Sequence, residues 1–215
     1  MKIVVMLKEI LYNFIKRVFD IFCTLIGLIL LIPLSLVIKV IHVLKGDFHS
    51  IFFSQIRIGK NGRKFKLYKF RTMIPNAEQK LQDLLKEDLY KKQWDKNQKI
   101  ENDPRITNVG RVLRKYSIDE IPQFINVLIG NMSLVGPRPL VEGELDRHKG
   151  NHKLYESVKP GITGLWASNG REKMSYKRRL KLEYYYIKNR SIFMDLKCVF
   201  RTIKVVLKSG KDFVV

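Results

Sequence analysis

The chain is organised around one stretch, Tyr116-Ser117-Ile118-Asp119-Glu120-Ile121-Pro122-Gln123, in which two acidic side chains are adjacent. The spacing of Ser117 and Glu120 fits a capping box, and proline is favoured in the first turn of a helix. We therefore expect a helix to begin here, with both carboxylates beside its unpaired N–H groups, where negative charge is stabilised. Because successive side chains on a helix point about 100° apart, the two carboxylates are expected to have different roles.

Basic residues surround this acidic pair. Arg111, Arg114 and Lys115 precede it, and Pro137-Arg138-Pro139 follows it. The two prolines restrict the backbone on each side of Arg138, whose planar guanidinium suits phosphate. An acidic pair among cations indicates phosphate chemistry, in which the cations hold an anionic substrate while a carboxylate holds a metal or attacks. A simple helix cap and a surface turn are the alternatives when each motif is taken alone.

The composition narrows the class of protein. A chain of 215 residues forms one domain, or one domain with an attachment element. It has 41 Lys and Arg against 20 Asp and Glu, a net charge of +21 that attracts nucleic acid, anionic lipid or phosphorylated substrates. The two cysteines, Cys23 and Cys198, provide no disulfide framework, which fits a reducing cytoplasmic setting. The four histidines show no metal-site spacing.

The N-terminal part contains an uncharged apolar run of 18 residues from Ile21 to Ile38. A straight helix that spans a bilayer needs about 20 residues. Pro33 should bend such a helix, and the run is flanked at both ends by the basic residues Lys16, Arg17, Lys39 and Lys45. We predict a re-entrant helical hairpin kinked at Pro33, with residues 1–45 in the membrane and residues 46–215 as a cytoplasmic, interfacial catalytic domain. A single tilted span and a secretory signal are the alternatives.

The remaining patterns predict an α+β fold that is mostly helical. Alternating residues on both sides of Gly59-Lys60-Asn61-Gly62 indicate a β-hairpin. Its mixture of basic and aromatic residues also fits a single-stranded nucleic-acid platform. Leucines at helical spacing predict one exposed amphipathic helix over residues 77–94, and the central helix should end near Gly130. The apolar face of residues 192–208 indicates a helix that lies in a membrane interface or packs on the core.

Taken together, the motifs resemble the bacterial sugar transferase family, the small monotopic phosphoglycosyl transferases that prime glycan assembly. The resemblance covers nearly the whole chain outside residues 74–100. The matching segments, in order, are Lys16-Arg17-Val18-Phe19-Asp20, Phe53-Ser54-Gln55-x-Arg57-x-Gly59, Tyr68-Lys69-Phe70-Arg71-Thr72-Met73, Leu113-Arg114-x-x-Ser117-x-Asp119-Glu120-x-Pro122-Gln123, Asn126-Val127-Leu128-x-Gly130-x-Met132-Ser133-x-Val135-Gly136-Pro137-Arg138-Pro139, Lys159-Pro160-Gly161-Ile162-Thr163-Gly164 and Asn169-Gly170-Arg171.

This resemblance implies transfer of a sugar 1-phosphate from a UDP-sugar to polyprenyl phosphate, usually undecaprenyl phosphate, with release of UMP. Asp119 would be the nucleophile that forms a phosphosugar intermediate, and Glu120 would hold Mg²⁺. The other residues expected to bind the phosphates and the UDP-sugar are Lys69, Arg71, Arg114, Arg138, Arg171, Pro137, Pro139 and Glu183. The expected location is the cytoplasmic face of the bacterial inner membrane, where anionic lipid would contact the basic surface. Such a reaction initiates the synthesis of a capsule, exopolysaccharide, O-antigen or glycoprotein glycan.

Two positions depart from the family pattern, and two other functions remain as alternatives. Ile32-Pro33 replaces the usual Ser-Pro at the hairpin bend, and Glu183 stands where an aspartate is usual. The alternatives are a catalytically inactive membrane scaffold and a membrane-tethered nucleic-acid-binding protein. We expect no nucleic-acid partner, because nucleic-acid grooves rarely carry a pair such as Asp119 and Glu120. The sequence leaves open which UDP-sugar is used and whether the chain forms a homo-oligomer.

Overall fold

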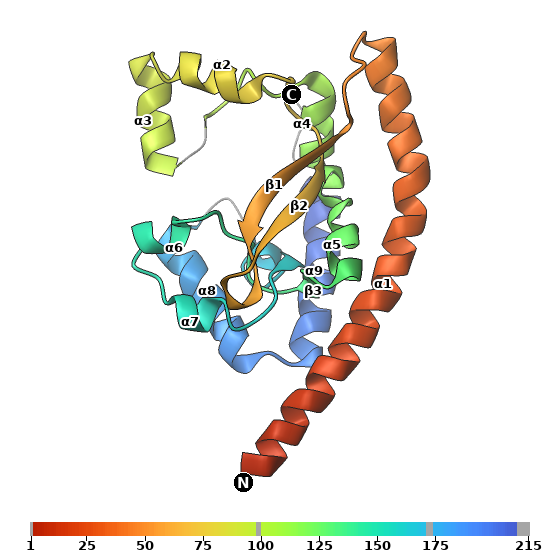
Figure 1. Cartoon of the computed structure of the whole chain (residues 1–215), viewed down its shortest axis with the longest axis vertical. Helices are drawn as coiled ribbons and strands as arrows, with labels where there is room; N and C mark the ends of the chain where they lie inside the picture. Colours follow the sequence, from red (N-terminus) through yellow and green to blue (C-terminus); the bar gives the residue numbers. More distant parts are fainter. Residues whose placement is uncertain (1, 98–99, 171–173, 210–215) are drawn as a thin grey trace.

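The computed structural model describes residues 2–97, 100–170 and 174–209, and it confirms an α+β fold that is mostly helical (Figure 1). Two small sheets lie between the helices. The elements are α1 (Lys2–Leu44), β1 (Phe52–Ile58), β2 (Lys64–Phe70), α2 (Ala77–Leu84), α3 (Asp88–Asn97), α4 (Asn108–Lys115), α5 (Gln123–Ile129), β3 (Ser133–Val135), α6 (Glu144–Arg147), α7 (His152–Tyr155), β4 (Gly161–Thr163), α8 (Tyr176–Asn189) and α9 (Ile192–Ser209).

The N-terminal helix α1 runs without a break for 43 residues, which corresponds to about 65 Å. Among the described residues it is the one helix long and apolar enough to cross a membrane, judged by length and composition. It continues through Pro33, so the structure does not confirm the predicted re-entrant hairpin or its kink. The physical reason is packing along its length: Leu31 and Ile38 are buried in a cluster with Ile51 and Phe70 of the domain.

Polar side chains also attach α1 to the domain. Lys16 forms a 2.8 Å ion pair with the buried Asp195 of α9, and Arg17 donates to the carbonyls of Val127 and Leu128 in the last turn of α5 at 2.6 and 2.8 Å. Asp20 accepts from the Ser133 hydroxyl at 3.1 Å and from the Leu134 N–H at 3.0 Å, at the start of β3. Three residues within little more than one turn of α1 therefore hold three separate elements of the domain.

The predicted β-hairpin is confirmed. Strands β1 and β2 pair antiparallel, with Phe53 opposite Lys69 and Arg57 opposite Phe65, and the turn contains Asn61 at φ 58°. Because side chains alternate across a strand, Arg57 and Lys69 lie on the same face of the hairpin. The opposite face carries Phe70, which is 1% exposed and packs in the cluster that includes α1.

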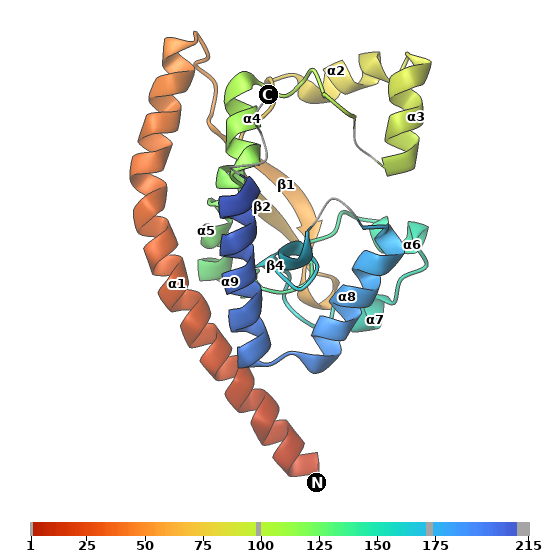
Figure 2. The ribbon, with the colours of Figure 1, turned by 180° about the vertical axis from the view of Figure 1, so that it is seen from behind.

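Residues 77–94 form two helices instead of the single helix that their leucine spacing predicted. Helix α2 ends at Leu84, and α3 begins at Asp88, a residue type that stabilises a helix N-terminus. Figures 1 and 2 show both helices projecting from the side of the domain opposite α1. Only part of the leucine face is covered, since Leu84 is buried and Leu89 is 65% exposed.

Strands β3 and β4 form a short parallel pair that depends on glycine. Ser133 lies opposite Gly161, and the Gly136 N–H donates to the Thr163 carbonyl at 2.8 Å. A Cβ atom at Gly136 would lie 2.5 Å from the backbone oxygen of Lys159, closer than side chains are found. The absence of a side chain therefore allows the segment that follows β3, which contains Arg138, to run against the loop that contains β4.

We expect Gly136→Ala to lower the free energy of unfolding by about 3 kcal/mol, because the added methyl group must push two backbone segments apart. Thermal unfolding of the purified protein in detergent measures this change. Gly46→Asn is the matched control, since nothing lies within 4 Å of a Cβ at this position and asparagine tolerates its φ of +74°. Equal melting temperatures for the two variants would contradict the close backbone approach.

Candidate active site

The acidic pair lies on a short turn between two helices. Helix α4 ends at Lys115, Ser117 adopts a left-handed conformation at φ 54°, and residues Ile118–Glu120 form a single 3₁₀ turn before α5 begins at Gln123. The predicted capping box is wrong, because the Ser117 side chain makes no cap hydrogen bond. The left-handed residue instead separates α4 from the 3₁₀ turn, whose two carboxylates lie within reach of Lys69 on the β-hairpin.

Lys69 of β2 contacts both carboxylates. Its ammonium nitrogen lies 3.0 Å from Glu120 Oε1 and 3.8 Å from Asp119 Oδ2. Asp119 is only 8% exposed, and burial raises the pKa of its carboxyl group. Lys69 opposes this shift most strongly, the charge of Glu120 adds to it, and Arg114 also opposes it. Nearby cations thus favour the ionised form of an otherwise desolvated carboxylate.

The position of Arg114 follows from the packing of α4. Thr107 caps this helix by accepting from the Gly110 N–H at 2.9 Å. A Cβ atom at Gly110 would overlap the backbone of Thr72, so glycine allows α4 to approach the segment after β2. Arg114 then donates from Nε to the Thr72 hydroxyl at 2.9 Å. The positive charge of Arg114 acts on Asp119 from the side of α4.

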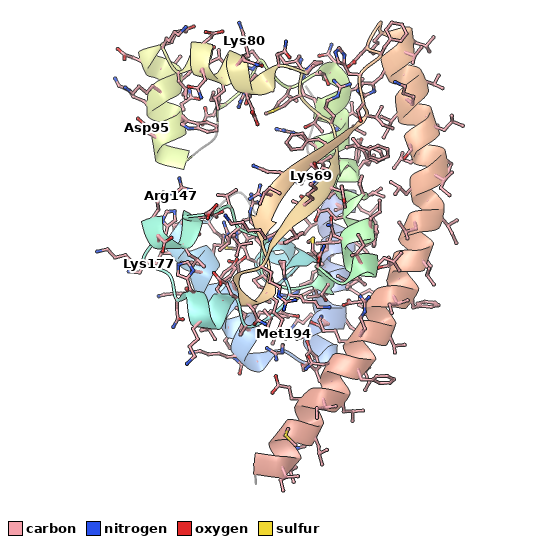
Figure 3. The ribbon with its side chains drawn as sticks, in the orientation of Figure 1. Lys69, Lys80, Asp95, Arg147, Lys177 and Met194 are labelled. Atoms are coloured by element: carbon pink, nitrogen blue, oxygen red, sulfur yellow. The ribbon has the colours of Figure 1, made fainter. Side chains whose placement is uncertain are left out.

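An open pocket of about 520 Å³ adjoins the acidic pair and the hairpin. Five of the residues predicted for the site line it, namely Lys69, Glu120, Arg138, Pro139 and Glu183. Figure 3 shows Lys69 near the centre of the molecule, whereas Lys80 and Asp95 lie far from it on α2 and α3. The pocket therefore combines one end of the acidic pair with cations from two separate segments.

Glu183 fixes the backbone of the Pro-Arg-Pro segment. It is 2% exposed, and it accepts from the Arg138 N–H at 3.0 Å, the Tyr155 hydroxyl at 2.9 Å and Arg179 Nε at 3.2 Å. Burial raises the pKa of Glu183, and these donors oppose the shift. The Arg138 guanidinium is left exposed, with its central carbon 5.8 Å from the centre of the Trp166 ring. Glu183 thus has protein partners, while Arg138 faces outward.

Other predicted residues lie outside the pocket. Arg71 forms a 2.9 Å ion pair with Asp47 and donates to the Ser50 carbonyl, so its guanidinium is engaged in holding the segment between α1 and β1. Pro137 lines a smaller neighbouring pocket of about 220 Å³. Arg171 lies outside the described residues.

Among the residues that line the main pocket and that the sequence interpretation did not assign to the site are Arg57, Gln123 and Trp166. Arg57 could have been found, because strand alternation and the hairpin turn place it on the face of Lys69. Trp166 gives no such signal, since its position depends on the packing of the β4 loop. Gln123, which is 3% exposed, follows directly from the position of the acidic pair at the start of α5.

The acidic pair has donors that fit Mg²⁺. The described residues contain no group of three or more His, Cys, Asp or Glu side chains arranged to hold a metal ion. Mg²⁺ is usually bound by one or two carboxylates, with water and substrate phosphates completing its coordination. One ammonium group already contacts both Asp119 and Glu120, so oxygens of both side chains face a common cation position. Glu120, which lines the pocket, is the better placed of the two.

These features define an α+β protein with a long apolar N-terminal helix and a site suited to anionic substrates. Residues 11–209 match the family model described as bacterial sugar transferase, and the chain belongs to this family.

The chain is also similar to named relatives. It is 43% identical over 197 residues to the UDP-galactose-lipid carrier transferase of Erwinia amylovora, covering 91% of this chain and 41% of the relative. It is 43% identical over 199 residues to the exopolysaccharide production protein ExoY of Sinorhizobium fredii, covering 92% of this chain and 88% of the relative. The chain is 38% identical over 209 residues to the UDP-N-acetylgalactosamine-undecaprenyl-phosphate N-acetylgalactosaminephosphotransferase of Aeromonas hydrophila, covering 94% of this chain and 46% of the relative. The chain thus spans less than half the length of two of these relatives.

We expect Glu183→Gln to lower the free energy of unfolding by about 1–3 kcal/mol, because Arg179 and the Arg138 N–H lose a charged acceptor. Chemical denaturation of the detergent-solubilised protein measures the change. The control is Glu142→Gln, whose side chain is 73% exposed and pairs only with Lys64 among the described residues. Unchanged stability of Glu183→Gln would show that this carboxylate does not hold the Pro-Arg-Pro segment.

Proposed function

We propose that this protein transfers a sugar 1-phosphate from a UDP-sugar to a polyprenyl phosphate such as undecaprenyl phosphate, releasing UMP and initiating the assembly of a glycan. The names of its relatives support this reaction class. The observation that carries the proposal is the contact of Lys69 with both Asp119 and Glu120 beside a pocket that also contains Arg138. A carboxylate attacks phosphorus effectively only when nearby cations mask the phosphate charge.

Asp119 is the proposed nucleophile. One of its carboxylate oxygens forms a bond to the β-phosphorus, and the bond from that phosphorus to the bridging oxygen breaks, so that UMP leaves with the electron pair. An oxygen of the lipid phosphate then attacks the same phosphorus and displaces Asp119. The burial of this carboxylate supports the role, because a desolvated carboxylate is a stronger nucleophile provided that neighbouring cations keep it ionised.

The remaining site residues bind and orient the phosphates. Lys69 and Arg114 act from two sides of Asp119, and Arg138 acts across the pocket. Glu120 would hold Mg²⁺, which when bound neutralises phosphate charge and orients the oxygens around phosphorus. Pro137, Pro139 and Glu183 fix the Arg138 backbone. Arg171 remains part of the proposal on the basis of its motif alone. The ion pair between Arg71 and Asp47 favours a structural role for Arg71.

We also propose that the protein sits on the cytoplasmic face of the inner membrane. Helix α9 has an exposed apolar stripe and runs beside α1 (Figure 2). The stripe comprises Phe193 (77% exposed), Phe200 (69%), Ile203 (51%) and Leu207 (69%). The outer face of α1 is similarly apolar, as in Ile29 and Ile32, which are 70% and 75% exposed. Apolar faces of this kind suit burial in the membrane interface, with anionic lipid near the basic surface.

Both ends of α1 are proposed to lie on the same side of the bilayer. Lys16 binds the domain near one end, and Lys39 donates to the carbonyls of Phe48 and His49 near the other. A helix that crossed the bilayer with these contacts intact would draw polar parts of the domain into hydrocarbon, at a large cost in free energy. If α1 bends at Pro33 in the lipid, it can enter and leave the bilayer by the same face, which avoids that cost.

The test of the reaction is UMP release from a panel of UDP-sugars with undecaprenyl phosphate and Mg²⁺. We expect Asp119→Asn to reduce turnover on the order of 10³-fold or more, since the attacking oxygen loses its charge. Glu120→Gln should weaken the response to Mg²⁺. Asp95→Asn on the distant α3 is the matched control. If the wild-type protein releases no UMP from any UDP-sugar, the alternative of a catalytically inactive scaffold is supported. Full turnover by the Asp119→Asn variant would exclude Asp119 as the nucleophile.

The test of topology is labelling of Lys8→Cys and Lys45→Cys, each in a background of Cys23→Ala and Cys198→Ala. We expect a membrane-impermeant maleimide to label both positions in inverted vesicles and neither in intact spheroplasts. The exposed Lys153→Cys on α7 serves as the reference for the side of the domain. Labelling of the two α1 positions from opposite sides would establish a single span and contradict same-side attachment.

A further inference from the structure

Two hydrogen-bond donors in the site pocket have no partner. Among the described residues, three buried side-chain nitrogen or oxygen atoms lack a hydrogen bond: Thr24 Oγ1, Arg57 Nε and Trp166 Nε1. Arg57 and Trp166 line the same pocket. A buried donor without an acceptor is costly, and in native proteins it usually indicates an absent water or ligand. Two such donors in one pocket point to an acceptor-rich ligand.

The same pocket contains cations without a carboxylate partner. Arg71, Arg105 and Arg179 each form ion pairs with carboxylates. Among the described residues, no carboxylate lies within ion-pair distance of Arg57 or Arg138. Burial, followed by the charge of Arg138, lowers the pKa of Arg57 to about 10. Two arginines that repel each other in one pocket are stabilised when an anion lies between them.

Arg57 is held in a fixed orientation by its neighbours. One terminal nitrogen donates to the Pro139 carbonyl at 3.3 Å, and the other donates to Gln55 Oε1 at 2.7 Å. The first bond joins Arg57 to the segment that presents Arg138, whose guanidinium lies over the Trp166 ring. The three side chains come from β1, the segment after β3 and the loop after β4, so they converge on the pocket from different directions.

We propose that Arg57, Arg138 and the indole N–H of Trp166 form a subsite for a phosphate monoester. The inference rests on the proposed function, in which the nucleotide phosphate leaves and the lipid phosphate enters. In-line displacement at phosphorus puts both groups on the side opposite Asp119. Lys69 and Glu120 line the same pocket next to Asp119. The cluster of Arg57, Arg138 and Trp166 is a second group of donors in that pocket, and it is suited to hold the departing and arriving phosphates. Arg57 is thus a substrate-binding residue in addition to those predicted from the sequence.

The test is calorimetric titration of the full chain in detergent with UMP, uridine and farnesyl phosphate, at a fixed Mg²⁺ concentration. We expect Arg57→Gln to weaken UMP binding about tenfold to a hundredfold, because a charged hydrogen-bond donor is lost. Uridine binding should be unchanged. Trp166→Phe, which retains the aromatic ring but loses the N–H, should weaken UMP binding severalfold. Arg63→Gln, on the exposed hairpin turn, is the control for the loss of one positive charge.

Arg57→Lys separates an effect on folding from an effect on binding, because it keeps the charge while losing the planar fork. Its UMP affinity should lie between those of the wild type and Arg57→Gln. Weaker binding of UMP, farnesyl phosphate or both in the Arg57→Gln variant supports the subsite and identifies which phosphate it takes. Wild-type affinity for both phosphates, or an equal loss for uridine, would overturn it. UMP release by the wild type is measured separately, so failure of the subsite is distinguishable from failure of the proposed reaction.

Discussion

Asn126 holds the β-hairpin against the helix that follows the acidic pair. This residue of α5 is fully buried, and its amide accepts from the Tyr68 N–H at 3.0 Å and donates to the Lys66 carbonyl at 2.6 Å. Both bonds are to β2, immediately before Lys69. A buried amide with both of its polar ends paired specifies one arrangement, because any slip of the strand would leave these groups unsatisfied. The distance from Lys69 to the acidic pair therefore depends on this one side chain.

The electrostatics of the site are built on that geometry. A chain with a net charge of +21 has many cations, but most of them lie on its surface, where solvent screens them. Lys69 is different, because it is held between two carboxylates in a partly buried position. Arg138 and Arg57 line the same pocket, and among the described residues neither has a carboxylate within ion-pair distance. The pocket thus has one cation paired with acids beside two arginines without ion pairs, an arrangement that the proposed metal and phosphate positions would use separately.

Local patterns in the sequence predicted local structure well. The hairpin follows from alternation around a glycine-containing turn, and α5 ends where Gly130 adopts φ 94°. Predictions that needed knowledge of distant partners were wrong or incomplete. Ser117 was expected to cap a helix with its side chain, but it adopts a left-handed conformation between α4 and the 3₁₀ turn and makes no cap hydrogen bond. Strand alternation places Arg57 on the face of Lys69, but its neighbourhood with Trp166 depends on how the loop after β4 packs, which no spacing along the chain encodes.

The long apolar helix α1 also takes part in the framework of the site. Arg17 binds the carbonyls at the end of α5, Asp20 binds the start of β3, and the ring of Phe124 fills the space that Gly27 leaves on α1. One end of α5 adjoins the acidic pair, and β3 leads directly into Arg138. A helix that holds both elements constrains the distance between Asp119 and Arg138. The contacts that attach α1 to the domain therefore also align the site, which explains why charged residues occur on α1 beside its apolar run.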